Sequence, residues 1–432
     1  LDSGGAKSES SDSETVVTRP QSEQKSGLTV WAARTFESLE NRNFRILWLS
    51  MLFTMGGFQM QMIARGILVF DLTGNATITA VVSMGFAPTL LLISLFGGAL
   101  GDRMDRRLII QIAQFVNLLA AVIILVLLLT DSIHWMHMFF VSMGQGAMFA
   151  LQMPARQAAI PALVGKDRVG NAVALNAMAM SLMNVGGPLI GGLIYGFGGP
   201  EAAYIAVSVM MASGFLVTGL IPKMYPPEST KKETVLQNIR GGFSYLSGNS
   251  MVRIMLLFSI MLALLSMPFR MMIPVFAKEL YDVDPSGVGI LAMMIGLGGI
   301  AASVLAASLR KGQRRGWVLL SAGGVAGASM LVMAIFPFYI VAIIFMIGVG
   351  FGETIRWGLG QALIMEATDD EYRGRMMSLL MMSFGVLPLA MLPAGYAVDR
   401  FGAEATLYGM TFLLLGATVI FIALSPSLRR LS

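Results

Sequence analysis

The feature that most constrains this chain is a series of long apolar runs. Each run is close to the ~20 residues that a helix needs to cross the hydrocarbon core of a bilayer. The runs lie at about residues 44–70, 76–99, 108–130, 135–156, 171–195, 201–221, 252–277, 286–309, 317–336, 338–365, 376–398 and 403–424. We therefore predict an all-α integral membrane protein with about twelve transmembrane helices.

Composition excludes a water-soluble globular fold. Of the 432 residues, 56% are hydrophobic and 13% are charged, whereas a soluble domain has roughly 25% charged residues. The predicted spans and their connectors use almost the whole length, so no large soluble domain fits. The 30 Lys and Arg residues against 25 Asp and Glu residues give a net charge of +5. In a membrane protein this small excess indicates basic cytoplasmic loops and not nucleic-acid binding.

Two polar segments set the expected domain boundaries. Residues 1–30 are rich in Ser, Glu, Gln and Gly, which cannot bury enough apolar surface to offset the entropy of ordering, and they lack the pattern of a secretory signal. The longest connector separates six runs from six. We expect a disordered cytoplasmic tail and juxtamembrane segment over 1–40, a six-helix bundle over 41–222, a cytoplasmic linker over 223–250, a second six-helix bundle over 251–424 and a cytoplasmic tail over 425–432.

The charges of the connectors set the expected orientation. Lys and Arg collect on one side of the predicted membrane, whereas the connectors on the other side hold mainly acidic residues such as Asp131, Asp282 and Asp399. By the positive-inside rule, the basic side and both termini are cytoplasmic. A multi-pass protein of the plasma membrane is the expected result.

Residues for common enzyme chemistry are missing. The chain has 0 Cys, and its 2 His, His134 and His137, lie in one short connector. Disulfides, thiolate nucleophiles, Cys-ligated metals and His-based triads are therefore excluded, and the two His are expected to be interfacial residues and not metal ligands. The chain also lacks the Gly-x-x-x-x-Gly-Lys-Ser/Thr loop that binds nucleotide phosphates. We expect no enzyme activity, no cofactor and no metal.

The two halves of the chain resemble each other. The segment QAAI at Gln157 recurs as QALI at Gln361, 204 positions later, and the basic pair at Arg106 recurs at Arg310 with the same offset. Because each half has an even number of spans, the copies share an orientation. The sequence therefore predicts two six-helix bundles related by a parallel repeat.

The connector after the second run carries a motif. It reads GALGDRMDRR, and its marked positions are Gly98, Asp102, Arg103, Arg106 and Arg107. The glycine permits close helix approach, and the carboxylate can pair with the neighbouring basic residues. The segment resembles the signature loop of the major facilitator superfamily, although Asp105 stands where that family usually has Gly. The resemblance implies a gating loop; the alternative is a solvated run of charges.

Further motifs resemble exporters of that superfamily. The fifth run contains Gly187, Pro188, Gly191 and Gly192, which resemble an exporter motif; the alternative is a Pro kink whose small residues serve helix packing. The segments PARQAAIPALV at 154–164 and DEYRGR at 370–375 look like the branch of macrolide-efflux and enterobactin-exporter-like proteins, or transmembrane secretion effectors. Many proton-coupled antiporters have an Arg three residues before a Gln-Gly pair, but here Ser142 precedes Gln145.

Charged residues at membrane depth mark the expected working site. Each costs roughly 2.5–3.5 kcal/mol on insertion scales, and they fall in runs one, four, seven and ten: Arg65, Arg156, Arg270, and Glu353 with Arg356. In the fold that the resemblance implies, these helices line a central cavity. The candidate residues for substrate binding or coupling are Gln59, Arg65, Gln145, Gln152, Arg270, Glu353 and Arg356.

Glu353 is the candidate for proton exchange. Arg356 lies three residues later on the same helix face, so the two are expected to pair, and a carboxylate there could titrate during transport. The alternative is a permanent ion pair that fixes the helix. For Arg65 and Arg270 the alternative is snorkelling toward the lipid headgroups.

The function that these observations predict is transport. We expect a monomeric secondary active transporter that exports hydrophobic or amphipathic small molecules by alternating access, with protons as the coupling ion and the lipid bilayer as its surroundings. The clusters among the 35 Met residues suit a cavity for varied apolar shapes, but ordinary lipid-facing or core packing is the better explanation for most of them. The alternatives are an importer or lysophospholipid flippase of the same fold, and a binding or receptor protein that does not transport.

Overall fold

The computed structural model describes residues 36–101, 104–225, 235–309 and 314–425, and over these residues the chain is helical with no strand. Residues 1–35 of the expected N-terminal segment and residues 426–432 of the expected C-terminal tail therefore lie outside the described residues. The first half consists of η1 (Glu37–Glu40), α2 (Arg42–Thr73), α3 (Ala76–Met84), α4 (Phe86–Gly101), α5 (Arg106–Leu129), α6 (Trp135–Val164), η2 (Lys166–Arg168) and α7 (Val169–Thr218).

Helix α8 (Val235–Gly248) lies in the segment expected as a linker. The second half consists of α9 (Ser250–Met271), α10 (Ile273–Tyr281), α11 (Pro285–Ser308), α12 (Arg315–Ile335), α13 (Tyr339–Glu366), η3 (Asp370–Tyr372), α14 (Arg373–Val386), η4 (Leu387–Ala390), α15 (Met391–Phe401) and α16 (Ala403–Leu424).

The predicted apolar runs correspond to helices or to pairs of helices in line. Runs two, seven and eleven are each interrupted, into α3 with α4, α9 with α10, and α14 with α15. Runs five and six are joined in α7, whose backbone breaks at Gly199 with φ 77°, a left-handed conformation that glycine adopts without strain. Nine of the described helical segments are long and apolar enough to cross a membrane.

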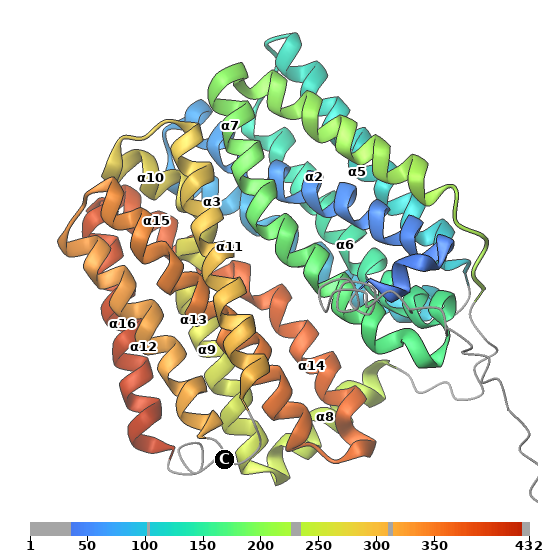
Figure 1. Cartoon of the computed structure of the whole chain (residues 1–432). Helices are drawn as coiled ribbons and strands as arrows, with labels where there is room; N and C mark the ends of the chain where they lie inside the picture. The colour runs from blue at the N-terminus through green and yellow to red at the C-terminus, as the bar shows by residue number, and fades with distance from the viewer. Residues whose placement is uncertain (1–35, 102–103, 226–234, 310–313, 426–432) are drawn as a thin grey trace, which may run out of the picture.

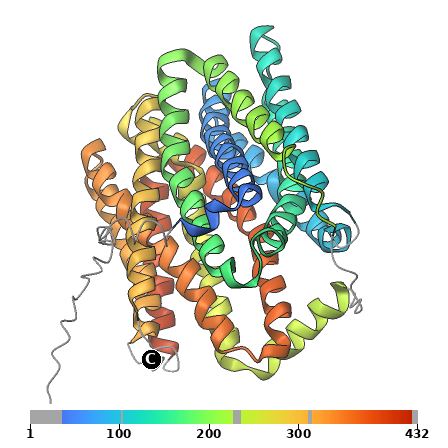
Figure 2. The ribbon, with the colours of Figure 1, turned by 45° about the vertical axis from the view of Figure 1, so that its right-hand side comes forward.

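The helices form two groups, one from each half of the chain (Figure 1). Figure 2 shows the same grouping after a 45° turn, with α8 and the start of α14 extending beneath the first group. The all-α fold with two bundles is the architecture that the sequence predicts. For convenience, the end at which α2 begins and α16 ends is called the terminal end, and the opposite end is called the far end.

The repeat between the halves is visible in how their first helices begin. Asn41 caps α2 by accepting from the backbone N–H of Phe44, and Asn249, 208 positions later, caps α9 by accepting from Val252 N–H. The segment before each helix also bonds to a later part of its own half. Asn41 Nδ2 donates to Leu163 O at 2.8 Å, and Asp369 N donates to the Tyr245 hydroxyl at 3.2 Å.

The halves share a core at the far end. One apolar cluster joins Ile67 and Phe70 of α2 to Val275 and Phe276 of α10 and continues through the second half. A separate cluster around Phe44 fills the terminal end of the first half and contains no described residue of the second half. The two bundles are therefore packed together at the far end.

A carboxylate strengthens this far-end contact. Asp399 of α15 accepts from the first backbone N–H groups of α3, with Ala76 N at 2.8 Å from Oδ1 and Thr77 N at 2.8 Å from Oδ2, and it also bonds to the Thr77 hydroxyl. Helix N-termini leave such N–H groups without partners inside the helix and favour negative charge. A residue of the second half thus caps a helix of the first half.

Candidate functional site

The central feature of the second half is an ion pair between α9 and α13. Arg270 Nη1 lies 3.2 Å from Glu353 Oε2, and the side chain of Glu353 is 9% exposed whereas that of Arg270 is 35% exposed. The expected pairing of Glu353 with Arg356 is wrong. The Arg270 side chain reaches Glu353 from the facing helix, and Arg356 instead donates to the Ser259 carbonyl of α9 at 3.3 Å.

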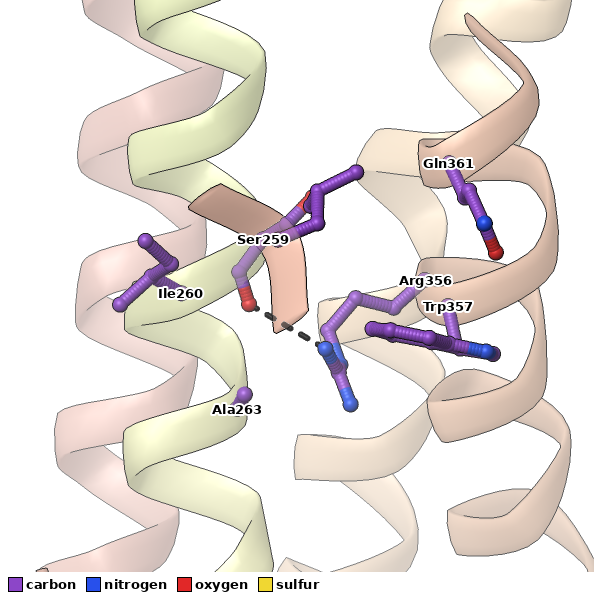
Figure 3. A pocket seen from close by; sticks show the side chains of 7 residues that line it. Ser259, Ile260, Ala263, Arg356, Trp357 and Gln361 are labelled. Atoms are coloured by element: carbon purple, nitrogen blue, oxygen red, sulfur yellow. Dashed lines mark hydrogen bonds between the residues drawn. The ribbon is translucent and has the colours of Figure 1, made fainter. Parts of the chain in front are cut away.

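Arg356 lines a pocket between α9 and α13. The pocket is partly open to solvent, and its lining residues are Ser259, Ile260, Ala263, Arg356, Trp357, Gln361 and Leu380. Figure 3 shows Arg356 pointing toward α9 with Trp357 beside it. Two polar atoms at this pocket are buried and have no hydrogen-bond partner, Arg356 Nε and Ser259 Oγ.

The first half holds a buried arginine with neutral partners. Arg65 of α2 donates to Gln145 Oε1 of α6, and Gln145 Nε2 donates to Gln61 Oε1 at 2.6 Å. Arg65 is 5% exposed, so snorkelling to headgroups is excluded for this residue in the structure. No carboxylate of the described chain segments forms an ion pair with Arg65.

The other predicted polar residues of the first half lie apart from this network. Gln59 Nε2 donates to Asn184 Oδ1 of α7 at 2.6 Å. Gln152 is buried, and its Nε2 has no partner. Arg156 is 2% exposed and donates to the Leu47 carbonyl at 3.3 Å, while its Nε and Nη2 have no partner.

The first half also holds an aromatic cluster that was not expected from the sequence. Phe58, Phe86 and Phe149 of α2, α4 and α6 have ring centroids 5.6–6.3 Å apart. Phe149 and Glu353 are 204 positions apart, which is the repeat offset. At this repeat position, the first half has an aromatic ring and the second half has its buried carboxylate. Comparison of the two halves at the 204-residue offset is the sequence signal that could have identified Phe149.

Part of the predicted gating loop is described. Asp102 and Arg103 lie outside the described residues, and Gly98 is helical in α4. Arg106 Nη1 donates to Ala158 O at 2.8 Å, and Arg107 Nε donates to Gln111 Oε1 at 3.2 Å. Asp105, which stands where the resembling family has Gly, caps α5. Its Oδ1 accepts from Arg107 N at 3.0 Å and from Met224 N at 2.8 Å, so it ties the start of α5 to the segment after α7.

The glycine motif of α7 lies where three helices cross. A Cβ added at Gly187 would lie 2.6 Å from Gln59 Cβ, and one added at Gly191 would lie 2.9 Å from Met60 Cα, both on α2. A Cβ added at Gly192 would lie 2.6 Å from the Cα of Gly289 on α11 of the other half. Pro188, also buried, follows Gly187 within the helix. The motif therefore brings α7 close to its own bundle on one face and to the opposite bundle on the other.

The structure thus brings some predicted residues together and separates others. Arg270, Glu353 and Arg356 are near one another beside an open pocket, and Arg65 is joined to Gln145. Gln59, Gln152 and Arg156 belong to other contacts. A buried carboxylate beside an arginine can exchange a proton as its surroundings change, and an arginine at a pocket can hold an anionic group.

Comparison with known protein families matches residues 33–429 to the family described as transmembrane secretion effector. Among curated proteins, the multidrug efflux pump Tap of Mycolicibacterium fortuitum is 25% identical over 376 residues, which is 84% of this chain and 91% of Tap. The enterobactin exporter EntS of Shigella dysenteriae is 23% identical over 283 residues, which is 65% of this chain and 66% of EntS.

Solved structures share the fold. The crystal structure of the nucleoside transporter NupG aligns with a TM-score of 0.72 at 14% identity, over 88% of this chain and 98% of that chain. A POT family transporter in complex with 5-aminolevulinic acid aligns with a TM-score of 0.72 at 12% identity, over 90% of this chain and 97% of that one. At these identities the likeness concerns the arrangement of helices alone.

Proposed function

The chain belongs to the transmembrane secretion effector family of the major facilitator superfamily, and from that premise we propose that it exports hydrophobic or amphipathic small molecules in exchange for protons. Relatives named as an efflux pump and an exporter support the direction of transport. The two-bundle fold supports alternating access, in which the halves rock about a site between them. We place the protein in the plasma membrane as a monomer, with the terminal end in the cytoplasm.

The observation that carries proton coupling is the Arg270–Glu353 pair. Glu353 is the carboxylate within the described spans that is both buried and ion-paired between two helices of the second half. When Arg270 is close, its positive charge pairs with the Glu353 carboxylate; when Arg270 moves away or binds a substrate, that carboxylate loses its partner and a proton can take the place of Arg270. Opening and closing of this contact would therefore alternate proton uptake with proton release.

The test is transport in vesicles that contain the purified full chain. A panel of lipophilic and amphipathic dyes is followed with an imposed pH gradient, without it, and with a protonophore. We expect gradient-dependent accumulation by the wild type. Glu353→Gln should abolish this accumulation but retain exchange of labelled for unlabelled dye, because exchange needs no net proton movement.

A carboxylate of the same helix supplies the matched control. Glu366 lies near the terminal end of α13 and bonds through both oxygens to Arg315, at 2.9 and 3.1 Å. Glu366→Gln should leave the response to the pH gradient intact. Gradient-driven accumulation by Glu353→Gln would contradict coupling through Glu353. Transport in the opposite direction would support the importer or flippase, and binding without exchange would support a receptor.

A further inference from the structure

The pocket between α9 and α13 has an unpaired positive charge. Its charged wall is Arg356, which makes one described hydrogen bond, to a backbone carbonyl, and leaves Nε buried without a partner. The nearby hydroxyl of Ser259 is also buried and unpartnered. Buried polar groups are normally bonded, so these two atoms leave hydrogen-bonding capacity at the pocket for a group with acceptor atoms.

The charges around the pocket leave this arginine uncompensated. The charged groups that act on Arg356 are Glu353 of its own helix and Arg270 of the facing helix. Those two are already paired with each other, so the carboxylate is shared between two guanidinium groups. The three side chains together carry one net positive charge.

The other residues that line the pocket indicate which further chemical features its ligand would have. Trp357 lies beside Arg356 and presents an aromatic ring, and Ile260, Ala263 and Leu380 are apolar. Gln361, one helical turn further along α13, adds an amide that can donate or accept. An arginine next to an aromatic face and an apolar wall suits an anionic group attached to a ring system.

We propose that this pocket binds the anionic group of the exported molecule, so that the preferred substrates are aromatic amphipaths carrying a sulfonate, carboxylate or phenolate. This proposal rests on the export function proposed above, and it adds the substrate class and the recognising residue. Arg356 holds the anion through Nε and a terminal nitrogen, Ser259 Oγ donates a further hydrogen bond, and Trp357 contacts the ring.

The test measures binding with two probes that share one skeleton. Anilinonaphthalene sulfonate is anionic, and N-phenyl-naphthylamine is its uncharged counterpart. Their fluorescence is titrated on the purified full chain in phosphatidylcholine nanodiscs, without any gradient. We expect Arg356→Gln to weaken binding of the sulfonate by about 10- to 100-fold, as for a lost charge-assisted bond, and to change binding of the uncharged probe less than about twofold. Arg356→Lys keeps the charge but not the two-nitrogen contact, so its sulfonate affinity should fall between those of the wild type and Arg356→Gln.

A second arginine of α9 supplies the matched control. Arg253 lies at the terminal end of that helix and donates to the carbonyls of Leu246 and Ser247. Arg253→Gln removes the same charge outside the pocket and should leave both affinities unchanged. Equal weakening of both probes by Arg356→Gln, or no weakening of either, would overturn the proposal.

Substitution of Glu353 should change the sulfonate affinity in the opposite direction to substitution of Arg356. Glu353→Gln removes the carboxylate that competes for the arginines, so the sulfonate should bind severalfold more tightly even though proton-driven transport is lost. Unchanged or weaker sulfonate binding would count against the site. Because binding is measured without a gradient, absence of proton coupling in the wild type would contradict the export mechanism and leave this result standing.

An anion in the pocket has a second possible source, the headgroup of an anionic lipid. Nanodiscs of phosphatidylglycerol distinguish the two sources. We expect the sulfonate affinity, relative to that of the uncharged probe, to stay within about threefold of its value in phosphatidylcholine. If Arg356→Gln removed a strong competition by phosphatidylglycerol, the pocket would be a lipid site and the substrate assignment would fail.

Discussion

At the scale of single residues, partner choice around Glu353 is the point on which sequence and structure differ. Spacing along a helix identifies Arg356 as a neighbour on the same face, but it carries no information about side chains arriving from another helix. In the structure, Glu353 forms its ion pair with Arg270 of α9. The residue types and their helices were predictable, whereas the pairing depended on how two helices face each other.

The pairing has a consequence for stability. Glu353→Gln leaves Arg270 without its partner, which costs roughly 3–5 kcal/mol for a fully buried pair. Arg270 is 35% exposed, so solvation offsets part of this cost, and we expect a loss of about 1–3 kcal/mol in the free energy of unfolding. Denaturant unfolding of the purified protein, followed by tryptophan fluorescence, measures it.

A double-mutant cycle checks the partner. The coupling energy between Glu353→Gln and Arg270→Gln should exceed that between Glu353→Gln and Arg356→Gln, since only the first two side chains form the ion pair. The reverse order would show that the helix neighbour is the partner after all.

At the scale of elements, contacts between helices of different halves hold the two bundles together at the far end. The carboxylate of Asp399 caps α3 from the opposite bundle. The apolar runs predict both helices, but capping across a bundle interface leaves no periodic signal, so the contact could not be predicted from the sequence.

Asp399→Ala should make opening of the far end easier. Loss of a helix cap costs about 1 kcal/mol, which corresponds to a roughly fivefold change in the open population. The chain has 0 Cys, so a cysteine introduced at Ala80, which is 0% exposed, reports opening through its reaction with a membrane-impermeant maleimide. We expect labelling to become several times faster with Asp399→Ala.

An acidic residue at the same end serves as the control. Asp282 accepts from Lys278 Nζ at 2.8 Å, both side chains are exposed, and this hydrogen bond lowers the pKa of Asp282. Asp282→Ala removes a charge without touching the other half and should not change the labelling rate. Equal rates for wild type and Asp399→Ala would show that the cap does not hold the far end closed.

The glycines of α7 provide a second comparison between elements. Gly192→Ala introduces a Cβ 2.6 Å from the Cα of Gly289, and overpacking of this kind costs about 1–3 kcal/mol. An added Cβ at Gly186 of the same helix meets nothing within 4 Å, so Gly186→Ala should be neutral or stabilising by up to about 1 kcal/mol. The shifts in thermal unfolding midpoint, relative to the wild type, should therefore differ in direction or clearly in magnitude between the two variants. Equal shifts would contradict a tight crossing of the two helices.

At the scale of the whole molecule, the apolar runs and the repeat together predicted the fold, because bilayer thickness limits helix length and an internal repeat limits how the two halves are arranged. The breaks within α7, α9 with α10, and α14 with α15 did not follow from hydropathy, since glycine and proline occur in unbroken membrane helices too. For the candidate site, charged positions on every third predicted helix were identifiable, but the aromatic cluster and the pocket needed the packed structure.

A reversible crosslink tests whether opening of the far end is part of transport. The side chains of Thr77 and Asp399 touch across the halves, and the chain has no other cysteine to interfere. Thr77→Cys combined with Asp399→Cys should form a disulfide under mild oxidation. We expect transport to stop on oxidation and to return to the level of the reduced variant after a reductant. Full transport by crosslinked protein would exclude far-end opening as a required step.

The near-contact of Gly192 with Gly289 also has a mechanical consequence, because Gly289 lies close to one end of the long helix α11. From Gly289 to the end of α11 at Ser308, the helix extends roughly 29 Å at about 1.5 Å per residue. A tilt of 10° about the crossing would carry that distant end through roughly 5 Å, while the two glycines would hardly change their separation. Most of the length of α11 therefore lies on one side of the crossing. A substitution that changes the angle at this crossing is therefore amplified at the other end of α11.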